Sequence, residues 1–288
     1  MTRSVILVLH PSRPEAHDWA AKVVRDLNSR KIDVFTASEI AIDGAKRKTD
    51  QELKNSVRDS ELVLVLGGDG TILRGTEIAH GSDVPVLGVN LGHVGFLAQI
   101  QRPSIESLVD AIDKKLYKTE RRMTLSYKIE RKGALVGEGW ALNEVAIERN
   151  TESMIELFVQ IDHRPLSRWG CDGVICATPT GSTAYAFSAG GPVVWPDVEA
   201  LVLLPLAAHA LFSDPMVVSP ESEIAIDVES DTGVISADGL RKFQLNSGDR
   251  VLMTSEKTFV SLALLEDVSF TDRLVAKFKL PVDGWRGE

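Results

Sequence analysis

Three glycines and one aspartate follow an apolar run in the first quarter of the sequence. Residues 62–66 (LVLVL) have the length of a buried strand, and Gly67-Gly68-Asp69-Gly70 follows them directly. Glycines keep side chains away from the backbone, and the N–H groups at the start of the next helix favour an anion such as phosphate. Phosphate would repel Asp69, so we expect this carboxylate to accept the proton of a hydroxyl that attacks a phosphoryl group.

An ordinary tight Asp-Gly turn at a strand end is the alternative for this loop. Two better-known phosphate loops do not match it. A P-loop requires a lysine after Gly-x-x-x-x-Gly, and the dinucleotide fingerprint requires Gly-x-Gly-x-x-Gly. Residues 67–74 (GGDGTILR) contain neither pattern. The loop therefore indicates a phosphate site of another class.

A second glycine-rich stretch, residues 88–97 (GVNLGHVGFL), follows another predicted strand. In an open parallel sheet the ligand lies beyond the carboxyl ends of the strands. We therefore expect this stretch to form the opposite wall of the same cleft. A plain strand-to-helix loop is the alternative. Phe96 would either stack on a base or fill the core.

Two polar residues, Asn143 and Glu144, lie inside an apolar stretch that predicts a strand over 140–147. Such residues are unusual in a core without partners. Adjacent strand residues point to opposite faces, so the pair reaches one ligand only near a strand end or a bulge. We interpret the pair as ligands for sugar hydroxyls or an adenine edge. A polar pair on an edge strand is the alternative.

Small and hydroxyl-bearing residues are concentrated at 177–192, shortly after Asp172-Gly173. Small side chains let a flat ligand lie against the backbone. Serine and threonine that cap a short helix are the alternative, and both interpretations can hold together. Asp238-Gly239 predicts a hairpin turn, and its composition indicates no further role.

The composition is that of a globular protein without a broad nucleic-acid surface. The 288 residues are 44% apolar and 25% charged, with a formal net charge of −9. Two cysteines, Cys171 and Cys176, are too few for a disulfide framework or a zinc site and predict buried thiols in a cytoplasmic protein. The six histidines show no metal-binding spacing. The apolar run at the start is too short for a signal peptide, and the run 201–212 is too short to span a bilayer.

The first 121 residues predict an α/β domain that carries the GGDG loop. Its alternating pattern predicts an open, parallel, Rossmann-like sheet with helices on both faces. Strands are expected at 5–9, 32–35, 62–66 and 84–89, and helices at 15–30, 50–59, from the glycine loop to about 80, and at 105–116.

Residues 122–265 predict a β-rich, β-sandwich-like domain, and residues 266–288 predict a final helix that packs back on the first domain. The expected strands are 123–129, 140–147, 154–161, 174–177, 200–206, 224–228, 234–236, 250–254 and 259–264.

Together these motifs resemble the NAD kinase family, whose members are ATP-dependent enzymes that phosphorylate NAD to NADP. The resemblance rests on GGDGT (67–71), the loop 90–97, Asn143-Glu144, and the stretch from Asp172 through TPTGSTAY (178–185), in the family's order. The family's α/β domain followed by a β-rich domain agrees with the predicted elements. Because diacylglycerol-type lipid kinases and sugar-phosphate kinases share the GGDG loop, a lipid or sugar kinase stays an alternative. A non-catalytic dinucleotide-sensing protein is another.

The resemblance implies a role for each matched residue. Asp69 would contact the 2′-hydroxyl of the adenosine ribose of NAD and accept its proton, with Arg74 fixing phosphate charge near the same ribose. Phe96 would lie near the adenine, and Asp172 would hold the nicotinamide ribose. The donor phosphates would bind the backbone N–H groups of Gly67, Gly68 and Gly70. The remaining implied NAD contacts are Gly70, Asn143, Glu144, Thr183, Ala184, Tyr185, Ala186, Phe187 and Ser188.

The chain departs from some relatives at Gly170, where others carry an arginine nearby, and at Leu240, where some carry a polar amide. These two positions leave secondary contacts to the dinucleotide open. The resemblance also implies Mg²⁺ that arrives with ATP, and no tightly bound organic cofactor. Polyphosphate as the donor, NADH as a substrate and product regulation stay open. Because family members are commonly homodimers or homotetramers, we expect a homo-oligomer that binds neither nucleic acid nor a membrane.

Overall fold

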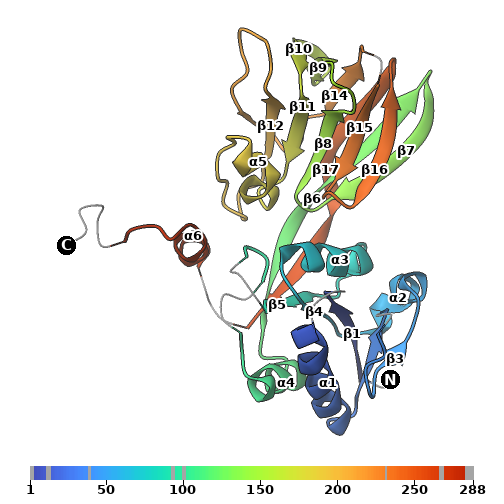
Figure 1. Ribbon diagram of the computed structural model, residues 1–288, viewed down its shortest axis with the longest axis vertical. Helices are drawn as coiled ribbons and strands as arrows, with labels where there is room; N and C mark the ends of the chain where they lie inside the picture. The colour runs from blue at the N-terminus through green and yellow to red at the C-terminus, as the bar shows by residue number, and fades with distance from the viewer. Residues whose placement is uncertain are drawn as a thin grey trace. The chain divides into compact units, whose positions relative to one another are not determined.

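The computed structural model describes residues 3–10, 14–37, 40–91, 95–98, 102–230, 232–265 and 269–282. The chain divides into two compact units (Figure 1). The α/β unit comprises Met1–Arg121 and Val260–Glu288, and the β-rich unit comprises Arg122–Phe259. Two strands run through the boundary along the chain, β6 (Lys118–Arg131) and β17 (Asp249–Leu264).

A parallel sheet forms the centre of the α/β unit, as the alternating sequence pattern predicts. Its strand order is β17-β5-β4-β1-β2-β3, and each neighbouring pair is parallel. Only the end of β17 takes part, where Leu262 and Ala263 lie opposite β5. The other strands are β1 (Arg3–Leu9), β2 (Ile32–Thr36), β3 (Lys46–Arg47), β4 (Leu62–Leu66) and β5 (Val86–Val89).

Helices cover both faces of this sheet, because successive residues of each strand point to opposite sides. In β4, Leu62, Leu64 and Leu66 share one core with the apolar faces of α1 and α4. Val65 faces the other side, where the backbone of Gly75 in α3 approaches so closely that a Cβ atom there would lie 2.5 Å from Val65 Cγ2. The helices are α1 (Pro14–Ser29), α2 (Asp50–Ser56), which a 3-10 turn follows (Val57–Asp59), α3 (Asp69–Ala79) and α4 (Ile105–Asp113).

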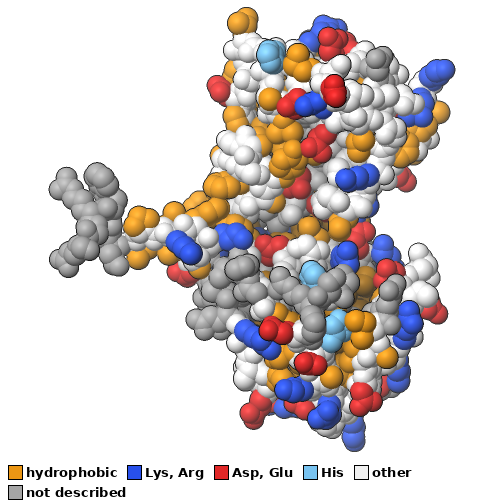
Figure 2. Space-filling view, viewed as in Figure 1, with side chains coloured by type: hydrophobic (Ala, Val, Ile, Leu, Met, Phe, Trp, Pro, Cys, Tyr) orange, Lys and Arg blue, Asp and Glu red, His pale blue; other side chains and the backbone are white. Residues whose placement is uncertain are grey.

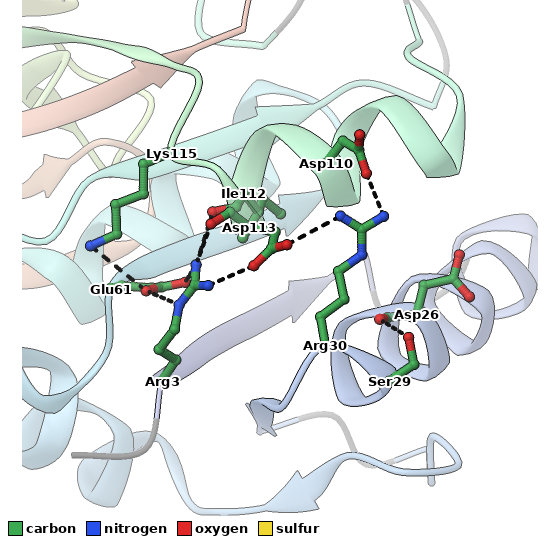
Figure 3. A network of polar contacts seen from close by, with 9 residues as sticks. All are labelled: Arg3, Asp26, Ser29, Arg30, Glu61, Asp110, Ile112, Asp113 and Lys115. Carbon is green, nitrogen blue, oxygen red and sulfur yellow. Dashed lines mark hydrogen bonds and ion pairs between the residues drawn. The ribbon is translucent and has the colours of Figure 1, made fainter.

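The amino ends of the central strands are tied by a network of ion pairs (Figure 3). Arg3, at the start of β1, makes two hydrogen bonds to the carboxylate of Glu61 at 2.9 and 3.0 Å and two to Asp113, at 2.6 Å to its carboxylate and 2.9 Å to its carbonyl. Arg30 pairs with Asp110 and Asp113 at the end of α4. These bonds to carboxylates, Glu61 above all, raise the pKa of Arg3. The network therefore joins β1, β4, α1 and α4 at the edge of the sheet away from the glycine loop.

The last helix, α6 (Phe270–Phe278), belongs to the α/β unit. It begins with a capping box, in which the side chains of Ser269 and Asp272 each accept a backbone N–H of the other residue. Arg273, 3% exposed, donates to the carbonyl of Phe96 at 2.8 Å. Hydrophobic side chains are visible along α6 in Figure 2, and within the helix they are partly exposed.

Two sheets form the β-rich unit, and the apolar residues between them form its core. One sheet is antiparallel throughout, with the order β13-β12-β11-β8-β15-β16. The other contains β10-β9-β14-β17, with β6 beside β17 and β7 beside β6. This arrangement confirms the predicted β-sandwich. The further bounds are β7 (Ala134–Ala141), β8 (Glu144–Arg149), β9 (Ile155–Ile161), β10 (Arg164–Cys171), β11 (Gly173–Ala177), β12 (Leu201–Leu206), β13 (Met216–Val218), β14 (Ile224–Val228), β15 (Thr232–Ala237) and β16 (Arg241–Asn246).

Several predicted strands differ from the observed ones. The stretch predicted as one strand over 140–147 is two strands, because β7 ends at Ala141 and β8 begins at Glu144. The stretches 250–254 and 259–264 belong to one strand, β17. The sequence analysis missed β3, β10, β13 and β16 and most of β7, and few residues of these strands are fully buried. A strand with a wet face carries too few apolar residues for an apolar run to identify it.

Candidate active site

The glycine loop is shorter than the sequence suggests, because α3 begins inside the motif. Gly68 is the N-cap of α3, and Asp69 is its first residue. A carboxylate in this position interacts favourably with the positive end of the helix dipole. The first N–H groups of a helix have no partner within the helix, so the loop presents backbone donors around Asp69.

The three glycines of the loop differ in what the fold requires of them. A Cβ atom at Gly67 would lie 2.4 Å from Thr71 Oγ1, so packing alone excludes a side chain there. At Gly68 and Gly70, no atom of the described residues lies within 4 Å of a Cβ position, and neither residue has a positive φ. Packing and backbone conformation therefore leave Gly68 and Gly70 unexplained, whereas an anion that approaches the backbone would require both.

Backbone donors from the second glycine-rich stretch hold the carboxylate of Asp69. Oδ2 accepts from the N–H of Phe96 at 2.9 Å, and Oδ1 accepts from the N–H of Leu97 at 3.2 Å. A Cβ atom at Gly95 would lie 2.1 Å from Oδ1. The structure thus brings residues 95–97 against Asp69. Residues 92–94 of the same stretch lie outside the described residues.

Phe96 and Arg74 have different surroundings. The ring of Phe96 is 8% exposed and packs against Phe270 and Phe278 of α6, with centroids 6.0 and 5.7 Å apart. This geometry favours the alternative that Phe96 fills the core. Arg74 is exposed on α3 and has no hydrogen bond or ion pair with any described residue, so its guanidinium is free to meet an anion.

In the β-rich unit, the strand break at Asn143 is held by a residue that the sequence analysis interpreted only as a turn. Asp238 accepts the backbone N–H groups of Leu142 at 2.9 Å, Asn143 at 2.7 Å and Glu144 at 3.3 Å. Arg241 also donates to Asp238, at 3.0 Å. Asp238 does lie in the β15–β16 hairpin turn, with a φ of 52°. No local signal could have revealed its second role, because the turn by itself explains an Asp-Gly pair.

Glu144 has the surroundings of a ligand-binding carboxyl group. It is 7% exposed, and its Oε2 is buried without a hydrogen-bond partner among the described residues. Burial first, and then the charge of Asp238, raise the pKa of Glu144 to about 8. Burial also raises the pKa of Asp238 to about 6, although its three backbone donors lower it. Glu144 is therefore mostly protonated at neutral pH, and its carboxyl group can both donate and accept a hydrogen bond.

The turn that carries hydroxyl groups is largely occupied with its own structure. Thr178 donates to the carbonyl of Leu142 at 2.5 Å, and Ser182 donates to Pro179 at 2.7 Å and accepts from Val194 at 2.9 Å. These buried hydroxyls therefore hold the turn itself. Neither the 3-10 turn (Gly181–Thr183) nor the helix α5 (Tyr185–Ser188) has a side-chain cap hydrogen bond, so the capping alternative does not describe them. A Cβ atom at Gly181 would lie 2.0 Å from the carbonyl oxygen of Asn143, so only glycine lets the turn lie against the strand break.

The other residues that we expect to bind NAD lie in or near this turn, and they range from buried to exposed. Asp172 is half-exposed and pairs with Arg149 at 2.6 Å. Tyr185 donates to Glu148 at 2.8 Å, and burial together with this carboxylate raises the pKa of Tyr185 to about 12. Thr183 ends a short 3-10 turn (Gly181–Thr183), Ala184 follows, and Tyr185–Ser188 form the single-turn helix α5, with Ala186 buried and Phe187 39% exposed. At the two departures, a Cβ atom at Gly170 would meet no described atom, and Leu240 is 40% exposed.

Two kinds of feature are absent from the described residues. Over that part of the chain, no group of three or more histidine, cysteine, aspartate or glutamate residues is arranged to hold a metal ion. Among the same residues, no helix is both long and apolar enough to cross a membrane.

A strand, a two-residue loop and a helix with open backbone donors are typical of a protein that binds a phosphorylated ligand. Residues 5–117 match the ATP-NAD kinase N-terminal domain, and residues 142–263 match the ATP-NAD kinase C-terminal domain. NAD kinase 2 of Streptomyces avermitilis is 47% identical over 292 residues, which cover 99% of this chain and 97% of the relative. An NAD kinase of Mycobacterium bovis is 45% identical over 303 residues, which cover 99% of both chains. The chain therefore belongs to the ATP-NAD kinase family.

Two solved structures are similar to this one over nearly the whole chain. Yeast NADH kinase, solved in complex with NADH, has a TM-score of 0.88 at 22% identity and covers 100% of this chain and 90% of its own. An NAD kinase from Archaeoglobus fulgidus, solved in complex with ATP, has a TM-score of 0.74 at 25% identity and covers 96% of this chain and 98% of its own. The first likeness shows the shared fold.

Proposed function

We propose that Asp69 is the catalytic base with which this chain carries out the reaction of its family. The chain is an NAD kinase and phosphorylates NAD to NADP with ATP. The observation that supports the role of Asp69 is its position: a carboxylate at the first residue of α3, held by two backbone N–H groups and next to glycines that packing does not require.

In the proposed reaction, the 2′-oxygen of the adenosine ribose forms a bond to the γ-phosphorus of ATP, and the bond from that phosphorus to the β,γ-bridging oxygen breaks. The proton of the 2′-hydroxyl passes to Asp69, and ADP leaves. Because the transition state of phosphoryl transfer is loose, positioning supplies much of the rate. Asp69 then orients the hydroxyl as well as accepting its proton.

The donor phosphates would bind the open backbone at Gly68 and Gly70, with Arg74 free to add positive charge. The N–H of Gly67 already donates to the carbonyl of Val89 at 3.0 Å, so the implied contact of Gly67 with phosphate has no free donor. Mg²⁺ would arrive with ATP and neutralise charge on the phosphates, since phosphate oxygens and water are its preferred ligands. Both suggestions agree with a loop that offers N–H donors and carries a single carboxylate.

NAD would contact the strand break in the β-rich unit. A buried carboxyl oxygen without a partner, as Oε2 of Glu144, is costly unless a ligand completes its hydrogen bonds. The edge of an adenine or a ribose hydroxyl supplies such partners. Asn143, Asp172 and the segment Thr183–Ser188 would complete the dinucleotide contacts. Phe96 would contribute its backbone near Asp69, because its ring packs against α6.

We extend the proposal to a homo-oligomeric state. Large apolar side chains are exposed near β12 and β13, and Leu211, at 110%, is the most exposed of them. Such clusters are typical of protein interfaces, and a second copy of this chain would cover them. The chain's other exposed apolar side chains there are Trp195, Val198, Phe212 and Val217. The two free, buried cysteines support a cytoplasmic location.

Replacement of Asp69 by Asn tests the proposed role. Asparagine keeps the size of the side chain but cannot accept the proton, so turnover should fall by roughly 10²–10⁴-fold. The measurement is the rate of NADP formation from NAD, ATP and Mg²⁺, with the thermal unfolding of both proteins as the control for folding. A folded D69N protein that turns over within a fewfold of the wild type would refute the role.

A further inference from the structure

The segment 95–98, which holds Asp69, is itself held by α6. Arg273 is the buried residue of this helix, at 3% exposure. Its Nη1 donates to the carbonyl of Phe96 at 2.8 Å and to the carbonyl of Ala98 at 3.4 Å. One guanidinium group therefore contacts two carbonyl oxygens of the segment whose N–H groups bind the carboxylate of Asp69.

One peptide group lies directly between Arg273 and Asp69. The carbonyl of Phe96 and the N–H of Leu97 belong to the same planar peptide unit. Its oxygen accepts from Arg273, and its nitrogen donates to Asp69 Oδ1 at 3.2 Å. A cation on the carbonyl side polarises the peptide, and hydrogen bonds in such a chain strengthen one another. The N–H of Leu97 thereby becomes a better donor to a negatively charged Asp69.

Aromatic packing fixes the same segment from its side-chain direction. The ring of Phe96 lies between Phe270 and Phe278, which come from opposite ends of α6, at interplanar angles of 39° and 51°. Tilted pairs at these centroid distances are favourable. The backbone of the segment is therefore tied to α6 at a ring and at two carbonyl oxygens, while its N–H groups face Asp69.

Burying the charged guanidinium group of Arg273 carries a desolvation penalty. Removing a charge from water costs several kcal/mol, and an apolar residue of similar volume often gives equal or greater stability. The cost is understandable if the group performs a task that an apolar residue cannot perform. Holding two carbonyl oxygens at fixed positions is such a task.

We propose that Arg273 is a positioning residue for phosphoryl transfer: through the peptide group between Phe96 and Leu97 it fixes the backbone donors that orient Asp69. The inference rests on the proposed role of Asp69 as the base. It extends the active site to the last helix of the chain, some 200 residues from the glycine loop.

The first test compares Arg273→Met with Lys277→Met, which removes an exposed cation from the same helix. Loss of a charge-assisted hydrogen bond should lower kcat of R273M by roughly 10- to 100-fold. KM for NAD and for ATP should change less than about twofold, because Arg273 contacts neither substrate in this proposal. K277M should keep the wild-type kcat. An R273M protein with wild-type kcat would overturn the proposal.

A double-mutant cycle with Asp69→Asn separates positioning from general loss of structure. If Arg273 acts through Asp69, R273M should lower the residual turnover of D69N by less than about twofold, since residues that act as a unit are not additive. If R273M lowers kcat by the same factor in both backgrounds, Arg273 has only a structural role, and the proposal fails. A D69N protein with wild-type turnover would instead refute the role of Asp69 itself.

If R273M does not fold, Arg273→Gln is the variant to test in its place. Glutamine keeps one N–H₂ group that can reach a carbonyl oxygen but carries no charge. We expect folded R273Q to lose kcat by less than R273M would, and the same cycle with D69N applies. Wild-type kcat in folded R273Q, or an equal loss in both backgrounds, would contradict the proposal.

Discussion

In the α/β unit, carboxylates lie at both ends of the parallel strands, and their partners differ. We call the side of the sheet where the strands begin the amino edge, and the side where they end the carboxyl edge. At the amino edge, Arg3 and Arg30 face carboxylates, and each charge meets a charge of the opposite sign (Figure 3). At the carboxyl edge, Asp69 is held by two backbone N–H groups, which satisfy its oxygens without a formal positive charge. The partners of the carboxylates at the amino edge are therefore side-chain cations, whereas the partners of Asp69 are backbone groups whose positions are set by the segment 95–97.

The comparison extends to the β-rich unit, where Asp238 also accepts backbone N–H groups, three in number. Arg241 pairs with it as well, so Asp238 combines both patterns. Its bonds hold the strand break that carries Asn143 and Glu144. Backbone-held carboxylates therefore occur at the glycine loop and beside the predicted dinucleotide contacts Asn143 and Glu144, whereas another predicted contact, Asp172, is charge-paired with Arg149.

Gly95→Ala should disturb the backbone donors of Asp69, and we expect from it the largest loss of activity. A Cβ atom at residue 95 would lie 2.1 Å from Asp69 Oδ1, so the carboxylate must move away from its backbone donors. We expect kcat to fall by about 100-fold, the middle of the range for general-base catalysis. Initial rates of NADP formation measure it.

Gly75→Ala is the matched control for Gly95→Ala. Its Cβ atom would lie 2.5 Å from Val65 Cγ2, so it overpacks the core without touching Asp69. It should lower the free energy of unfolding by about 1–3 kcal/mol, with a smaller change in kcat than G95A shows. Equal losses of kcat in the two variants would mean that the contact with Asp69 has no special importance.

Gly68→Ala and Gly67→Ala form a second pair within the glycine loop. In G68A the added methyl group would enter open space, so stability should stay within about 1 kcal/mol of the wild type, while KM for ATP should rise about tenfold because the backbone donors become obstructed. In G67A the added methyl group would meet Thr71 Oγ1 at 2.4 Å and should destabilise the fold. Thermal unfolding and KM for ATP distinguish the two. A wild-type KM in G68A would remove the argument that Gly68 serves a ligand.

Arg3→Met tests the amino edge. About a third of the Arg3 side chain is exposed, so solvent screens its ion pairs, and we expect a loss of about 1 kcal/mol in the free energy of unfolding. The kcat should stay at the wild-type value, because the network lies at the far edge of the sheet from Asp69. Lys46→Met, in the more exposed pair with Asp33, should change neither quantity. A loss of kcat in R3M with intact folding would contradict the separation of the two edges.

The last expected effect is a dependence of stability on pH that comes from Glu144. Its pKa is about 8 in the folded chain and near 4.5 in the unfolded chain. Between these values the folded chain binds more protons than the unfolded chain, so stability falls as pH rises from about 5 to about 8. Urea unfolding at pH 6 and pH 8 should show a smaller difference for Glu144→Gln than for the wild type. An unchanged difference would mean that Glu144 titrates normally.

The local sequence was sufficient to predict those features of the fold and the site that depend on neighbouring residues. The run Leu62–Leu66 predicts β4 with its observed bounds, because five consecutive apolar residues that end at glycines suit a strand covered on both faces. The glycine loop likewise directs attention to Asp69, since an acidic residue among glycines at a strand end is chemically unusual. The same local rules predicted one strand over 140–147 and missed β16.

What the tertiary structure decided is which backbone groups each carboxylate meets. Asp69 binds N–H groups 27 and 28 residues away, and Asp238 binds three that are 94 to 96 residues away. A backbone N–H carries no side-chain identity, so nothing in the amino-acid order marks Phe96, Leu97 or Asn143 as a donor. Those donors are decided only when the sheets and turns pack together and bring distant segments of the chain into contact. The sequence by itself determined that a carboxylate among glycines follows β4, and the folded chain determined how that carboxylate is held.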